Sequence, residues 1–129
     1  MFEFVKNDNG NNFPIIEEKP AAAGTYEVGD ALVYATGKVA IASGGTVKPA
    51  FICASKVVAS SGDKIAVNPV YAGQTWKTTF SADGSALKAG AKVTISADGQ
   101  KVTATTTNGV ATLAEDGGAT GASVLVKFL

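Results

Sequence analysis

The stretch ALVYATGKVAIA, residues 31–42, contains the pattern that decides the fold. Two apolar runs, residues 31–34 and 38–42, flank the pair Thr36-Gly37. In the second run, Val39 and Ile41 alternate with residues of the other parity. Alternation with a period of two is typical of β-strands, and a short glycine-containing pair between two such runs is typical of a hairpin. The stretch therefore predicts two antiparallel strands joined by a tight turn.

The same pattern recurs along the chain from residue 25 onward. Asp98-Gly99 and Asn108-Gly109 each predict a further hairpin turn, the second between residues 103–107 and 110–113. One helical turn is expected within residues 85–89. Evenly punctuated short strands predict an all-β fold, either a compact small β-barrel or β-tulip or a sandwich of short antiparallel strands. The alternating apolar positions are Ile65 and Val67, Trp76 and Phe80, Val93 and Ile95, Val102 and Ala104, and Val124, Val126 and Phe128.

Residues 1–24 differ in composition from residues 25–129, and we expect an extended N-terminal arm on a β-barrel or sandwich body. Asparagine, glycine and proline in the first segment favour irregular backbone. Its apolar side chains could bind a partner by adding a strand to a neighbour's sheet edge. A frayed terminus and an arm lying on its own body are the alternatives. The candidate partner-binding residues are Phe2, Phe4, Phe13, Ile15 and Ile16.

The composition argues against several classes of function. The chain has no histidine, no arginine and one cysteine, so the usual nucleophile–base pairs and zinc sites lack their side chains. Its 11 lysines balance 11 acidic residues, which gives no field to attract nucleic acid or an anionic membrane. We expect no enzyme activity, no metal, no cofactor, no nucleic acid and no membrane partner.

Two residues that could carry chemistry are better explained by packing. Cys53 lies in the apolar run 50–54 and is expected to be a buried thiol that acts as a small hydrophobic side chain. Trp76 is in phase with Thr78 and Phe80, which favours a place in the core over an exposed stacking platform.

The body resembles the small capsid decoration (cement) proteins of tailed bacteriophages. The resemblance lies in Gly29-Asp30 before residues 31–34, in Gly62-Asp63 before residues 64–67, and in the final strand at residues 122–128. Low charge, abundant Ala, Gly and Thr, and a polar N-terminal segment also fit. The resemblance implies a β-barrel or β-tulip on the outside of an icosahedral head, often as a trimer, with its arm on the major capsid protein.

The sequence thus leads to a functional hypothesis with two alternatives. We expect a decoration protein that is made in the host cytoplasm, resides on the capsid surface of the virion and stabilises contacts between capsomers. Its partners would be the major capsid protein and further copies of itself, with a trimer favoured. The alternatives are a carbohydrate- or surface-binding β-sandwich of the adhesin type, which predicts exposed Trp76 or Tyr71, and another head or tail component of a phage.

Overall fold

The computed structural model describes residues 1–43 and 45–129, and it confirms an all-β fold. Within these residues there are strands, turns and irregular segments but no helix. Residues 85–89, where one helical turn was expected, form a turn instead, in which the Leu87 amide donates to the Gly84 carbonyl. Accordingly, the described residues contain no helix with the length and apolarity needed to cross a bilayer. The strands are β1 (Glu3–Asn7), β2 (Glu17–Pro20), β3 (Gly24–Tyr26), β4 (Ala31–Ala35), β5 (Lys38–Ile41), β6 (Phe51–Cys53), β7 (Val57–Ala59), β8 (Lys64–Pro69), β9 (Gln74–Thr79), β10 (Lys92–Val93), β11 (Ala111–Leu113) and β12 (Ser123–Phe128).

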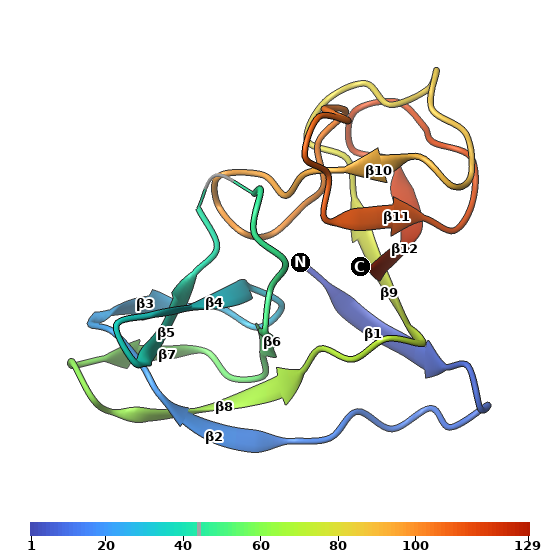
Figure 1. The fold of residues 1–129 in the computed structure, drawn as a ribbon. Coiled ribbons are helices and arrows are strands. Elements are labelled where there is room, and N and C mark those ends of the chain that lie inside the picture. The colour runs from blue at the N-terminus through green and yellow to red at the C-terminus, as the bar shows by residue number, and fades with distance from the viewer. Residues whose placement is uncertain (44) are drawn as a thin grey trace.

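The strands form two five-stranded antiparallel sheets and one two-stranded sheet (Figure 1). The C-terminal sheet has the order β1-β9-β12-β11-β10, and the central sheet has the order β2-β8-β6-β4-β5. The small sheet pairs β3 with β7. The chain passes from the C-terminal sheet to the central sheet through residues 8–16 and returns through residues 70–73. The central sheet is therefore an insertion between two strands of the other sheet that are themselves paired.

The hairpin predicted at residues 31–42 is present as β4 and β5, with Ala35 opposite Lys38. Thr36 and Gly37 have φ values of 48° and 79°, so both adopt the left-handed conformation that two-residue hairpin turns of type I′ require. At the far side of the central sheet, Ala21 forms a parallel bridge with Val39 of β5. The two edges of the sheet therefore meet at one point, without the continuous ladder of a closed barrel.

Two apolar cores hold the sheets together. One lies inside the curved central sheet and contains Leu32, Val39 and Val67, all with no exposed surface. The other lies where the C-terminal sheet packs on the central sheet and contains Trp76, Phe80 and Ile52 among others. Burying an aliphatic or aromatic side chain contributes roughly 1.5–3 kcal/mol, so these alternating apolar positions supply the main drive for folding.

Residues 1–24 are part of both sheets, which corrects the expectation of an extended arm on a separate body. β1 pairs antiparallel with β9, and β2 pairs antiparallel with β8. The two segments find their strand partners within the same chain: the one with apolar residues at positions 2 and 4 pairs with β9, and the run 17–20 pairs with β8. The boundary placed at residue 24 thus falls at the start of β3 and separates no structural units.

A turn is present at Asn108-Gly109 as expected, but the segments before and after it pair with other parts of the chain and not with each other. Residues 103–107 do not pair with β11; instead the Thr103 amide donates to the Thr94 carbonyl and the Thr94 amide donates to the Thr105 carbonyl. β11 pairs with β10 and β12. Turn chemistry was predicted correctly here, but a non-local strand pairing replaced the local hairpin.

Candidate functional site

A cavity of about 620 Å³ lies where the loop before β4, the start of β7 and residues 98–101 come together. Its volume is in the range of small-molecule sites, roughly 300–1,000 Å³. Acidic and basic side chains line it together: Glu27, Asp30, Asp98, Lys56 and Lys101. The polar contacts of these side chains decide what the cavity can do.

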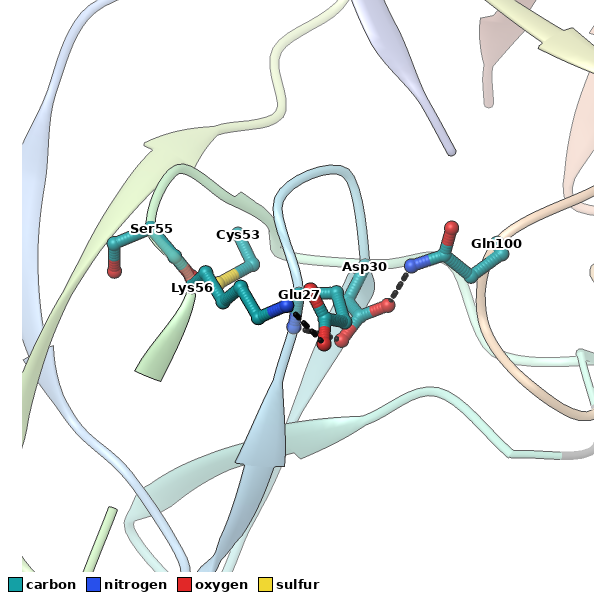
Figure 2. Close-up of polar contacts among 6 residues, drawn as sticks. All are labelled: Glu27, Asp30, Cys53, Ser55, Lys56 and Gln100. Carbon is teal, nitrogen blue, oxygen red and sulfur yellow. Dashed lines mark hydrogen bonds and ion pairs between the residues drawn. The ribbon is translucent and has the colours of Figure 1, made fainter. Parts of the chain in front are cut away.

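Asp30 is the buried polar centre of this cavity, with 2% of its surface exposed. One carboxylate oxygen, Oδ2, accepts a hydrogen bond of 2.8 Å from the backbone amide of Glu27. The other, Oδ1, accepts a hydrogen bond from the side-chain amide of Gln100 (Figure 2). Gln100 follows the Asp98-Gly99 turn, far from Asp30 in sequence, so this pair ties the loop before β4 to the C-terminal half of the chain. A hydrogen bond to a charged group contributes about 1.5–3 kcal/mol, which makes the pair a structural link.

The other charged groups around the cavity also bind partners within the chain. The Lys56 ammonium lies 3.6 Å from the Glu27 carboxylate, but both side chains are largely exposed, and exposed pairs contribute about 0–1 kcal/mol. Asp98 accepts hydrogen bonds from the Ser96 hydroxyl and the Gln100 amide. Burial opposes ionisation of Asp98, but these hydrogen bonds together outweigh it and lower the pKa of the carboxyl. The charged side chains that line the cavity thus mainly cross-link parts of the same chain. Among the residues described, no group of three metal-ligating side chains occurs.

Cys53 lies on β6 beside this cavity and is buried, with 1% of its surface exposed (Figure 2). Its thiol donates to the Ser55 carbonyl over 3.0 Å. Burial raises the pKa of the Cys53 thiol, which lowers the fraction of reactive thiolate near neutral pH. The expectation of a buried, packing thiol is confirmed.

The raised pKa of Cys53 predicts a pH effect on stability. A thiol with a raised pKa in the folded state contributes stability below the pKa of the unfolded thiol, about 8.5, and this is lost as pH rises through the folded pKa. We expect the urea midpoint of the wild type to fall more between neutral and alkaline pH than that of Cys53→Ala. Burial raises the pKa of Tyr26 as well, and the neighbouring Cys53 adds to that rise, so the difference between the two proteins reports Cys53 together with its effect on Tyr26. Equal losses in the two proteins would contradict the assignment.

The five candidate partner-binding residues divide into two groups in the structure. Phe2 is 2% exposed, and its ring centroid lies 5.3 Å from that of Phe128. Phe4 is half-buried and meets Trp76 edge-on at 5.4 Å. Both therefore belong to the core of their own chain, which corrects their assignment to a partner. Their burial follows from the pairing of β1 with β9, which no local pattern reveals.

Phe13, Ile15 and Ile16 remain on the surface, with 79%, 54% and 68% of their areas exposed. They lie together in residues 8–16, the segment between β1 and β2, which we call the apolar loop. In Figure 1 this segment runs along one end of the molecule, between the end of β1 and the start of β2. Three large apolar side chains within four positions are exposed to solvent, and such clusters mark interaction sites.

The asparagines of the apolar loop fix its shape. The Asn11 amide donates to Asn9 Oδ1 over 2.9 Å, and the Phe13 amide donates to Asn11 Oδ1 over 2.8 Å. These are consecutive Asx turns, in which a side chain replaces a backbone acceptor. The Asn68 side-chain amide on β8 also donates to the Ile15 carbonyl over 2.9 Å. The Asn-rich composition, interpreted as irregular backbone, thus supports a defined loop that presents Phe13.

The alternative of a stacking platform depends on whether Trp76 or Tyr71 is exposed. Trp76 is 1% exposed, and the core position predicted for it is confirmed. The rings of Phe4 and Phe128 pack against the indole, and its nitrogen finds no hydrogen-bond partner among the described residues. Tyr71, by contrast, is 50% exposed in the crossing 70–73. This crossing is bonded to the apolar loop through the Asp8 amide, which donates to the Gly73 carbonyl.

The edge strands β1 and β2 are shaped against pairing with another chain. β1 carries a β-bulge between Phe4 and Lys6, which interrupts the regular ladder. β2 contains Glu17, Glu18, Lys19 and Pro20, and charges and proline on an edge strand block addition of a further strand. Contacts with a partner on this side of the molecule would therefore be made by exposed side chains rather than by addition of a strand to β1 or β2.

No protein-family model matches this chain, and no curated protein matches its sequence.

Proposed function

We propose that this protein is a capsid decoration protein of a tailed bacteriophage, which binds the outside of the head and stabilises contacts between capsomers of the major capsid protein. The observation that supports the proposal is the apolar loop, a preformed surface with Phe13, Ile15 and Ile16 exposed. Residues 9–16 carry no charge, so the loop matches an uncharged apolar surface on the partner.

The energetics favour binding of many copies over a single tight contact. Each apolar side chain of the loop contributes roughly 1.5–3 kcal/mol when fully buried, whereas association costs about 4–15 kcal/mol in lost rigid-body freedom. One loop therefore binds weakly on its own. A capsid presents the same site many times, and a trimer of this chain would present three loops, so linked contacts would raise the overall affinity.

The mode of binding differs from strand addition. Phe2 and Phe4 are held in their own sheet, and the edges of β1 and β2 are blunted. We therefore propose that the loop docks by inserting side chains into a groove on the shell. Because the Asx turns hold the loop in shape before binding, the ordering cost of roughly 1–2 kcal/mol per residue is largely avoided.

Substitutions in the loop test the proposal more sharply than truncation. Deleting residues 1–24 would remove β1 and β2 and unfold the protein, so loss of binding would be uninformative. We expect Phe13→Ser and Ile16→Ser to lower the affinity for undecorated heads by about tenfold or more each, because about 1.4 kcal/mol corresponds to a factor of ten. Co-sedimentation with heads assembled from the major capsid protein of the same genome measures this.

A matched control separates the loop from general surface apolarity. Val58 lies on β7 and is 77% exposed, so Val58→Ser removes a similar apolar area elsewhere. We expect this variant to bind heads like the wild type. Failure of the wild-type protein to bind such heads would refute the proposed function, and equal losses with Val58→Ser would remove the apolar loop from the mechanism.

A further inference from the structure

The sequence contains two Asn-Gly pairs, Asn9-Gly10 in the apolar loop and Asn108-Gly109 in the turn before β11. The amide nitrogen of the second residue can attack the side-chain amide carbon of asparagine, and glycine obstructs this attack least because it has no Cβ. We propose that Asn9 is a site of spontaneous deamidation in the folded protein, whereas Asn108 is protected by packing. The reaction needs water and no enzyme.

The reaction at Asn9 proceeds through a cyclic intermediate. The Gly10 nitrogen loses its proton and bonds to Asn9 Cγ, while the bond from Cγ to Nδ2 breaks and ammonia leaves. The product is a five-membered succinimide that includes both residues. Water then adds to one of the two ring carbonyls and opens the ring. Attack at Cγ gives aspartate, and attack at the backbone carbonyl gives isoaspartate, in which the chain continues through the side chain.

The structure leaves Asn9-Gly10 free to react. Asn9 is exposed, and Gly10 has a φ of +85° with no atom within 4 Å of the place where a Cβ would lie. Two hydrogen bonds must open before the nitrogen can attack: the one from the Gly10 amide to the Asn7 carbonyl over 2.9 Å, and the one from the Asn11 amide to Asn9 Oδ1 over 2.9 Å. Both hydrogen bonds are exposed to water, and no described residue packs on Gly10, so the pair can open and reach the ring-closing geometry.

Asn108-Gly109 has the same sequence but a different environment. A Cβ on Gly109 would lie 2.6 Å from the backbone of Lys92 and Val93, so this glycine is wedged against β10. The Val110 amide donates to the Val93 carbonyl over 2.9 Å and fixes the next peptide. Rotation of the Asn108-Gly109 peptide would break this packing, so ring closure is hindered although Asn108 itself is exposed.

Deamidation of Asn9 would change the surface that carries the proposed function. Aspartate keeps an oxygen that can accept the Asn11 amide, but it adds a negative charge to residues 9–16, which carry none. Isoaspartate lengthens the backbone and disrupts the Asx turn between Asn9 and the Asn11 amide, which precedes the turn that positions Phe13. Either product would weaken docking on an apolar surface, an effect that rests on the proposed function, whereas the modification itself does not.

Peptide masses measured on the purified protein test the modification. Folded protein is kept in mildly alkaline buffer and then digested with trypsin, which does not cleave before Pro20 and so yields residues 7–38 with Asn9 and residues 102–127 with Asn108. Replacement of NH₂ by OH raises a peptide mass by about 1 Da, and fragment ions locate the change among the asparagines of residues 7–38. Isomerisation at Asp-Gly pairs leaves the mass unchanged. We expect conversion at Asn9 to be several-fold faster than at Asn108 in folded protein, and the two rates to become similar in urea. Equal rates in the folded protein, or an unchanged Asn9, would overturn the inference.

Binding of substituted proteins tests the consequence separately. Asn9→Asp reproduces one product, and Asn108→Asp places the same charge in the turn before β11. We expect Asn9→Asp to bind undecorated heads several-fold more weakly than Asn108→Asp. Equal binding by both would refute the effect on docking while leaving the mass result intact. Failure of the wild type to bind heads would instead count against the proposed function alone.

Discussion

Replacing Phe2 by alanine is expected to lower the free energy of unfolding by about 3–5 kcal/mol, the range for truncation of a buried phenylalanine. Phe2 is 2% exposed and packs against Phe128, and it precedes β1 at the edge of the C-terminal sheet. Its removal would leave a cavity between two distant parts of the chain. Because whole domains are stable by about 5–15 kcal/mol, this loss would be a large fraction of the total. Urea unfolding followed by Trp76 fluorescence measures it.

Phe13→Ala is the matched control for this prediction. The same side chain is removed from the same segment, but Phe13 is 79% exposed. Substitutions at such surface positions usually change stability by less than about 0.5 kcal/mol. Similar small effects of both substitutions would mean that residues 1–24 are an independent arm after all, and that β1 does not form part of the core.

Gly45→Ala is expected to destabilise the protein by about 2–5 kcal/mol. A Cβ at this position would lie 2.0 Å from the Ile95 carbonyl oxygen, which belongs to backbone and cannot move aside alone. The φ of +66° costs a further ~1–2 kcal/mol for a residue with a side chain, in addition to the ~1–3 kcal/mol typical of overpacking. The Ile95 amide donates to the Gly45 carbonyl over 3.2 Å, so the clash would also separate this loop from the C-terminal half. The urea midpoint reports the change.

Gly37→Ala separates the two contributions to the Gly45 effect. Gly37 has a φ of +79°, but a Cβ there would meet no atom within 4 Å. Only the conformational cost applies, and we expect a loss of about 1–2 kcal/mol. Equal losses for Gly37→Ala and Gly45→Ala would show that the contact with Ile95 is not tight.

The sequence predicted those features of the fold that depend on neighbours in the chain. Alternation identified Trp76 and Phe80 as core positions, and Thr36-Gly37 gave the correct turn and the correct two strands. The environment of Cys53 also followed from its apolar run. In each case the period of the pattern or the chemistry of the turn is set within a few residues, so tertiary structure did not have to be known.

Features that depend on distant partners could not be predicted in this way. Phe2 and Phe13 look equivalent in the sequence, and only the pairing of β1 with β9 buries one and leaves the other exposed. The run after residue 102 has strand character, but its hydrogen bonds go to Thr94 rather than across the Asn108-Gly109 turn. Strand propensity predicts that a segment is extended and does not specify its neighbour.

The residues of the candidate site also divide into those with a local sequence signal and those that depend on distant partners. Phe13, Ile15 and Ile16 were identified from their apolar character in a polar segment, which is a local signal. The Asx turns that hold the loop were missed, although the Asn9-x-Asn11-x-Phe13 spacing contains the information. The link from Asp30 to Gln100 has no local signal, because its two ends come from different halves of the chain.

The insertion of the central sheet between β1 and β9 sets the order in which the protein can assemble during synthesis. β1 leaves the ribosome first, but its partner β9 ends at Thr79, and β12, which pairs with β9 on the other side, ends at Phe128. The strands of the central sheet, residues 17–69, are complete well before that. β1 therefore cannot pair until β9 has been translated, and Phe2 cannot pack against Phe128 until β12 has been translated.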